Sequence, residues 1–121
     1  MLLDSNIIIY AAKPEYGALR NFIAIHAPAV SAISAVEVLG YHRLTELERL
    51  YFEEFFAAAS VLQLSEEVIE QAIKLRQIRK ISLGDALIAA TALVYDLKLV
   101  TRNTKDFMWI PKLSVLNPFE T

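Results

Sequence analysis

Three carboxylates in this sequence stand among apolar residues instead of on a charged helix surface. Asp4 follows the short apolar run 1–3, Glu37 lies among small and apolar residues, and Asp85 precedes the apolar stretch 86–95. A carboxylate is costly to bury unless a hydrogen bond or a cation compensates its charge. The three acids are therefore the first candidates for chemistry in this chain.

A purely structural interpretation is open for each of the three acids. Ser34 and Glu37 have the Ser-x-x-Glu spacing of a capping box, and Ser82 precedes Asp85 by the same distance. Asp4 precedes a short helix that we expect to begin at about residue 7, after a turn at residues 5 and 6. Acids at a helix N-terminus are stabilised by backbone N–H groups and by the helix dipole. If all three are caps, no chemistry is required.

The alternative is that Asp4, Glu37 and Asp85 converge on one site. Clustered carboxylates raise one another's pKa unless a cation binds between them. The chain has no cysteine, so the ligands would be oxygen atoms, which suit Mg²⁺ or Mn²⁺. The chemistry that matches such a site is metal-assisted hydrolysis of a phosphodiester, in which the metal orients the attacking water and stabilises the developing charge.

A fourth contributor to this site is expected from the segment 101–107, which reads TRNTKDF. Asn103 could be a neutral metal ligand or an ordinary turn residue, and Asp106 could be a catalytic acid or the cap of the turn before Phe107. Polar groups around a metal commonly hold its ligands by hydrogen bonds, and basic groups could contact substrate phosphates. The candidates for these surrounding roles are Ser5, Asn6, Thr101, Arg102, Asn103 and Lys105.

Short apolar runs alternate with longer segments of helical periodicity along the whole chain. This alternation predicts an α/β fold with a mostly parallel five-stranded sheet. Ligands in such folds bind beyond the carboxyl ends of the strands, where the strand order reverses. The expected strands are 1–4, 29–31, 61–64, 98–101 and 113–116. The expected helices are 7–13, 15–26, 34–40, 45–59, 65–80 and 83–95.

Composition limits the classes of protein to which the chain could belong. Its 121 residues fit a single domain, 1–121, and the formal net charge of −2 carries no basic signature. Nucleic-acid binding would therefore need local Lys and Arg clusters or metal ions. The absence of cysteine excludes disulfides and thiolate metal sites. Asp4 interrupts any signal peptide and the apolar stretches are too short for a membrane span, so we expect a cytoplasmic protein.

Four motifs, in this order, together resemble the PIN-domain family, and most of all its small VapC-type toxins of bacterial toxin–antitoxin modules. They are LLDSNIIIY, SAISAVEVLG, GDALIAATAL and LVTRNTKDF, and the resemblance continues to the closing LSVLNPF. The resemblance implies a three-layer α/β/α fold and a Mg²⁺- or Mn²⁺-dependent endoribonuclease. It also implies a homodimer that a small cognate antitoxin protein neutralises.

Carried over position by position, the resemblance assigns Asp4, Glu37 and Asp85 to the family's three main acids. Asn103 stands where many relatives have Asp, and Asp106 lies three residues further on. Many relatives have Pro before the third acid, where this chain has Gly84, so we expect an altered turn there.

Two rival interpretations and one surface question stay open. The same fold could be a weak or inactive binding and regulatory module, whose acids cap helices or meet a partner's Arg. A phospho-accepting receiver-like domain would need paired acids after the first strand, and this chain has none there. The apolar positions of segment 47–59 belong to the core or to a dimer contact, or else they form a groove for an antitoxin helix.

Overall fold

A fully parallel five-stranded sheet, in the order β3-β2-β1-β4-β5, lies at the centre of the molecule. The computed structural model describes residues 1–120. The strand order reverses at β1, which lies between β2 and β4, so the crevice predicted for ligands opens at its carboxyl end. The strands are β1 (Leu2–Leu3), β2 (Ala29–Ser31), β3 (Val61–Leu62), β4 (Leu99–Val100) and β5 (Val115–Leu116).

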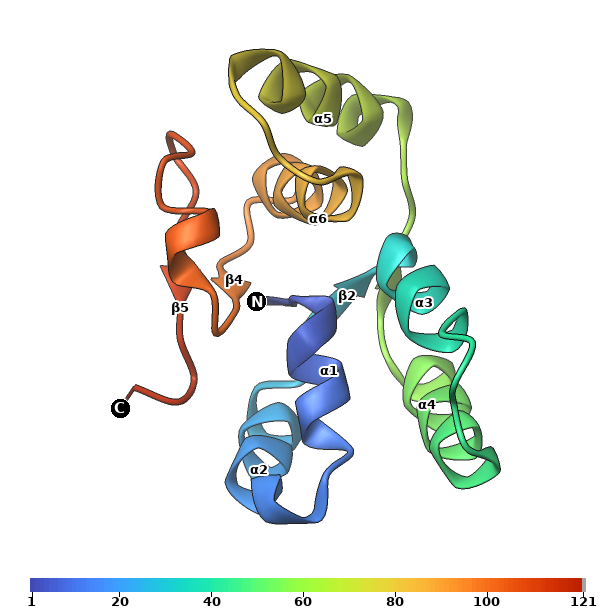
Figure 1. Ribbon diagram of the computed structural model, residues 1–121. Helices are drawn as coiled ribbons and strands as arrows, with labels where there is room; N and C mark the ends of the chain where they lie inside the picture. The colour runs from blue at the N-terminus through green and yellow to red at the C-terminus, as the bar shows by residue number, and fades with distance from the viewer. Residues whose placement is uncertain (121) are drawn as a thin grey trace.

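Helices cover both faces of the sheet, which confirms the three-layer α/β/α prediction. Leu2 and Leu99 pack with α5 and α6, whereas Leu3 and Val100 pack with α1, α2 and α4 in a second core. Figure 1 shows α5 and α6 together on one side of β1 and β4, with α1 and α2 on the other. The helices are α1 (Ser5–Ala11), α2 (Gly17–His26), α3 (Ala32–Leu39), α4 (Glu46–Ala58), α5 (Glu66–Ile78) and α6 (Leu83–Val94), with short 3-10 turns η1 (Pro14–Tyr16) and η2 (Thr104–Asp106).

Two helices begin earlier than the sequence pattern predicted. Helix α1 begins at Ser5 instead of about residue 7, and α3 begins at Ala32 instead of Ser34. The cap of α3 is Ser31, whose side chain accepts a hydrogen bond from the backbone N–H of Ile33 at 3.3 Å. The predicted capping box at 34–37 is therefore wrong. Each of these strands passes directly into its helix, so the cap is the last strand residue or the one after it.

Helix α6 carries the most apolar sequence of the chain and is largely buried between α5 and the sheet. Its cap is Ser82, as predicted, with the Asp85 N–H donating to the Ser82 hydroxyl at 3.1 Å. Despite this apolar character, no helix within residues 1–120 combines the length and hydropathy needed to cross a membrane. The capped start of α6 brings Asp85 into the first turn of a buried helix.

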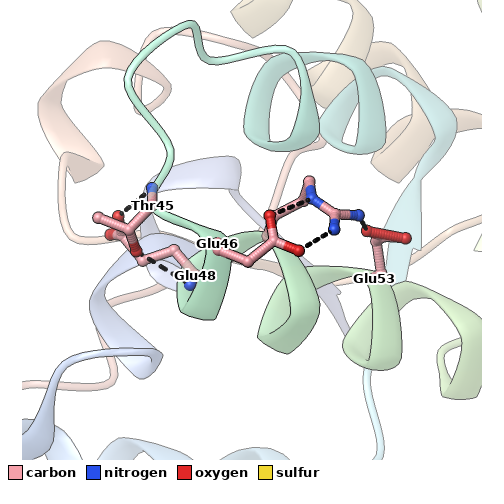
Figure 2. A network of polar contacts seen from close by, with 5 residues as sticks. Thr45, Glu46, Glu48 and Glu53 are labelled. Carbon is pink, nitrogen blue, oxygen red and sulfur yellow. Dashed lines mark hydrogen bonds and ion pairs between the residues drawn. The ribbon is translucent and has the colours of Figure 1, made fainter.

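Helix α4 begins with a capping box formed by Thr45 and Glu48. The Glu48 N–H donates to the Thr45 hydroxyl at 3.1 Å, and the Thr45 N–H donates to Glu48 at 3.0 Å. Arg49 binds Glu46 and Glu53 on the same helix (Figure 2). These are the only ion pairs between side chains in residues 1–120. Both ion-pair partners of Arg49 thus belong to its own helix, α4.

Only part of the apolar sequence of α4 is buried. Leu47 and Leu50 are apolar positions of the segment 47–59, yet both are exposed, Leu47 at 81%. Phe52 is 1% exposed and packs into the core shared with α1 and α2. Helix α4 is oriented so that its aromatic side chains face the core, and the two leucines therefore lie at the surface.

We expect Phe52→Ala to lower the free energy of unfolding by about 3–5 kcal/mol, because it opens a cavity in the core. Leu47→Ala, on the same helix, should change it by less than about 0.5 kcal/mol. Urea denaturation of both variants measures the two values. Equal losses would contradict the burial of α4 described here.

Candidate active site

Asp4 lies at the carboxyl end of the central strand, with its side chain only 4% exposed. Its backbone N–H donates to the carbonyl of Val100 at 2.9 Å, which continues the pairing of β1 with β4. Its Oδ2 accepts a hydrogen bond from the Thr101 hydroxyl at 2.8 Å. Although Asp4 precedes α1, its side chain makes no capping hydrogen bond. Asp4 thus occupies the N-cap position of α1, but its side chain does not cap the helix and instead bonds to the residue after the neighbouring strand β4.

Glu37 lies inside α3, past its first turn, so it cannot cap that helix either. Its Oε1 accepts a hydrogen bond from the Ser5 hydroxyl at 2.8 Å. The same Ser5 oxygen lies 2.9 Å from the hydroxyl oxygen of the buried Ser34. Because Ser5 follows Asp4 directly in the chain, this hydroxyl pair ties the Glu37 carboxylate to the end of β1.

The Glu37 carboxylate lies directly against Gly84, which has no side chain. A Cβ atom at Gly84 would lie 2.4 Å from Glu37 Oε2, which is far closer than a contact distance. The sequence predicted an altered turn at this glycine, and the structure gives it a different role, since it leaves room for a carboxylate from α3. The sequence signal was a glycine inside an otherwise apolar helix start.

Asp85, in the first turn of α6, is half-buried beside these groups. Burial raises the pKa of its carboxyl, the nearby Ser82 hydroxyl lowers it, and the negative charges of Asp106 and Glu37 raise it further. The pKa of the Asp4 carboxyl rises to about 6, chiefly because it is buried, with smaller increases from the charges of Asp85 and Glu37. The Thr101 hydrogen bond opposes this rise. Asp4, Glu37 and Asp85 are therefore coupled electrostatically, and Asp106 acts on Asp85.

No basic side chain neutralises this group of acids. Within the described part of the chain, none of Asp4, Glu37, Asp85 and Asp106 forms an ion pair with Lys, Arg or His. A buried carboxylate at neutral pH is stable only when a compensating charge is near. The arrangement consequently favours a cation from solution.

The two candidates for the fourth position have different surroundings. Asp106, in η2, lines a pocket together with Asp85 and raises the pKa of the Asp85 carboxyl. Asn103 donates its backbone N–H to the Thr101 hydroxyl at 3.1 Å, and that hydroxyl in turn donates to Asp4. Asp106 thus lies near Asp85 and Asn103 lies near Asp4, and the metal-ligand role predicted for Asn103 and the catalytic role predicted for Asp106 both stay predictions.

The predicted metal ligands are near one another without forming a closed site. In residues 1–120 there is no group of three Asp, Glu, His or Cys side chains close enough to hold one ion. The donor chemistry nevertheless fits a hard divalent cation, because the groups are all carboxylates and lack a basic partner. Glu37 and Asp106 are exposed, so their side chains can rearrange, whereas Asp4 is fixed by Thr101.

Arg102 has a structural role that the sequence did not predict. Its guanidinium lies 5.2 Å from the centre of the Tyr10 ring and 4.7 Å from that of Phe119. Cation–π contacts of this kind join the loop after β4 to α1 and to the end of the chain. Its predicted contact with substrate stays a prediction, as does that of the exposed Asn6.

The raised pKa of Asp4 predicts a pH dependence of stability in the metal-free protein. A carboxyl whose pKa is about 6 in the folded state and near 3.8 when unfolded binds its proton more tightly in the folded state. The folded state should gain stability as the pH falls from about 7.5 toward 4. The full gain in the free energy of unfolding is roughly 3 kcal/mol, because each pKa unit of difference between the two states contributes about 1.4 kcal/mol.

Asp4→Asn should remove most of this dependence and stabilise the metal-free protein at pH 7.5. Urea denaturation in EDTA at pH 7.5 and 5.5 tests both statements. If Asp4→Asn is less stable than the parent at both pH 7.5 and pH 5.5, the charged form of Asp4 stabilises the folded protein, which contradicts the prediction.

Comparison with known proteins places the chain in a family. The family model described as PIN domain matches residues 1–111. A segment of 36 residues, 30% of this chain and 27% of the relative's length, is 56% identical to Ribonuclease VapC of Rickettsia bellii (strain RML369-C). The chain thus matches about a quarter of that curated relative.

Two solved structures resemble the chain over nearly its whole length. A toxin-antitoxin complex from Klebsiella pneumoniae has 31% sequence identity and a TM-score of 0.77, covering 99% of this chain and 98% of that one. VapBC2 from Rickettsia felis, bound to a DNA fragment from its promoter, has 25% identity and a TM-score of 0.84, covering 96% of both chains. The chain belongs to the PIN domain family.

Proposed function

We propose that the protein is a metal-dependent endoribonuclease that hydrolyses phosphodiester bonds of RNA. The observation that carries this proposal is the buried Asp4 at the end of the central strand, whose carboxyl is affected by the charges of Glu37 and Asp85, with no ion pair to any of these three acids within residues 1–120. The similarity to a protein named Ribonuclease VapC supports RNA as the substrate.

Asp4, Glu37 and Asp85 are the proposed holders of Mg²⁺ or Mn²⁺, with Asn103 or Asp106 at the fourth position. When bound, the cation supplies a polarised water and stabilises charge on the attacked phosphate. The Thr101 hydroxyl fixes the buried Asp4, and the Ser5 hydroxyl donates to the more exposed Glu37, so two of the proposed ligands have a hydroxyl partner.

The biological setting that we propose is a toxin–antitoxin module, with this chain as the toxin. The similar structures from Klebsiella pneumoniae and Rickettsia felis are complexes of this class, and they support a cognate antitoxin protein as the partner. A homodimer, implied by the family resemblance, stays a prediction that light scattering can test. We propose the cytoplasm as the location, because the proposed substrate is cellular RNA.

A second candidate is a PIN-type binding module without activity. The observation that favours it is the absence, in residues 1–120, of three acids grouped closely enough for one ion. The two candidates differ in their response to metal. Mn²⁺ should raise the melting temperature of the nuclease by mass action, whereas it should leave an inactive module unchanged.

We expect purified protein to cleave RNA with Mn²⁺ or Mg²⁺ and to lose cleavage in EDTA. Asp4→Asn and Asp85→Asn should each lower the rate by about 100-fold or more, since each removes a ligand of the ion that stabilises the transition state. The matched control is Asp96→Asn, an exposed residue just after α6 with φ of 53°, a conformation that Asn tolerates. Cleavage that survives in both site variants would refute the proposal.

Gly84→Ala should weaken Mn²⁺ binding and RNA cleavage without destabilising the fold. The added Cβ displaces the carboxylate of Glu37, which is the free end of a flexible side chain, while Ala favours the helix by about 0.5–1 kcal/mol. The melting temperature without metal measures the stability of the fold, and its rise with added Mn²⁺ measures metal binding. A cleavage assay measures the loss of activity.

Gly17→Ala is the matched control for this substitution. Its Cβ would meet only the end of the Arg20 side chain, at 3.5 Å. If Mn²⁺ binds Gly84→Ala and Gly17→Ala equally well, Glu37 does not contribute to the metal site.

A further inference from the structure

A polar pocket of about 290 Å³ lies directly beside Asp85 and Asp106. Three segments form it, namely the end of α5, the start of α6 and the turn that follows β4. Its remaining lining includes the basic residues Arg79, Lys80 and Lys105 and the aromatic ring of Trp109. The pocket is therefore lined by three cations together with two of the candidate acids, Asp85 and Asp106.

The cations of this pocket are not committed to other charges. Within residues 1–120, Arg79, Lys80 and Lys105 form no ion pair. The Arg79 guanidinium lies 5.0 Å from the centre of the Trp109 ring, and the Trp109 Nε1–H donates to the Asp106 carbonyl at 2.9 Å. The aromatic ring thus holds Arg79 at the pocket while leaving its positive charge available.

Several other basic groups of the protein are not part of this pocket. Arg49 is bound by two glutamates of its own helix, and Arg102 and Lys13 lie over aromatic rings near the end of the chain. With a net charge of −2, the surface as a whole repels a polyanion. A strand of RNA that brings one phosphodiester to the acids needs a nearby group of cations for its neighbouring phosphate.

We propose that this pocket binds the nucleotide adjacent to the cleaved bond, with its phosphate paired by Arg79, Lys80 and Lys105. The pocket volume of about 290 Å³ lies close to the lower end of the roughly 300–1,000 Å³ that is typical of small-ligand pockets. A ligand as small as one nucleotide suits a pocket of this size. The proposal rests on the proposed function for its ligand, RNA. Three cations against two carboxylates give the pocket a positive balance, and this balance orients the strand relative to Asp85.

The test is binding of a fluorescently labelled single-stranded RNA in EDTA, followed by anisotropy over a range of salt concentrations. Replacing both Arg79 and Lys105 by Gln should raise the dissociation constant by about tenfold. The slope of log affinity against log salt should fall by roughly 1 to 1.5, at about 0.7 for each lost phosphate contact. Lys105→Arg should retain the parent affinity.

The matched control replaces Lys74 and Lys98 by Gln. This pair has the same charge change and lines a different pocket, beside the start of β4. Its affinity and salt slope should stay much closer to those of the parent. If both double variants lose affinity equally, the effect is one of net charge, and the pocket is not a binding site.

The outcomes separate this pocket from the proposed hydrolysis. A parent protein that cleaves RNA with Mn²⁺ while the Arg79 and Lys105 variant binds normally would overturn the pocket and leave the nuclease intact. A parent that binds RNA through these residues and never cleaves would overturn the nuclease and leave the pocket. A parent that fails to bind RNA at low salt overturns the pocket. Lys105→Gln alone, which leaves the Arg79–Trp109 contact in place, guards against a folding defect.

Discussion

The burial of Asp4 at the end of β1 is the constraint on which the rest of the structure depends. A charge there is unfavourable, and the fold reduces its cost with one hydroxyl, that of Thr101 at the end of the neighbouring strand. Parallel pairing of β1 with β4 is what makes the two residues neighbours. Because the compensation is incomplete, the pKa of Asp4 is raised to about 6, and the cation that we propose for this site would offset the remaining charge.

Small polar residues and one glycine arrange the other acids around this position. Ser5 links Glu37 to the end of β1, and Gly84 leaves the space that the Glu37 carboxylate occupies. These groups come from α1, α3 and α6, so the site stands where three helices begin or meet at the carboxyl edge of the sheet. Ser5 and Gly84 are the positions of these helices that contact the Glu37 carboxylate.

The charges of the molecule are divided between two adjoining places. The acids repel one another at the end of the central strand, while Arg79, Lys80 and Lys105 lie in the pocket next to them. Arg49 is paired with two glutamates of its own helix and Arg102 lies over aromatic rings, and neither lines this pocket. The pocket that we propose for the adjacent nucleotide therefore lies on the side of Asp85 and Asp106.

The sequence by itself determined the α/β class, the parallel sheet and the three embedded acids, because short apolar runs and helical periodicity are local properties of the chain. Only the tertiary structure decided what the acids do. A Ser-x-x-Glu spacing at 34–37 indicated a cap, yet α3 begins at the end of β2, and Glu37 bonds to Ser5, 32 residues away. Asp4 likewise meets Thr101 across 97 residues. Contacts over such distances depend on strand order and helix packing, which no local pattern encodes.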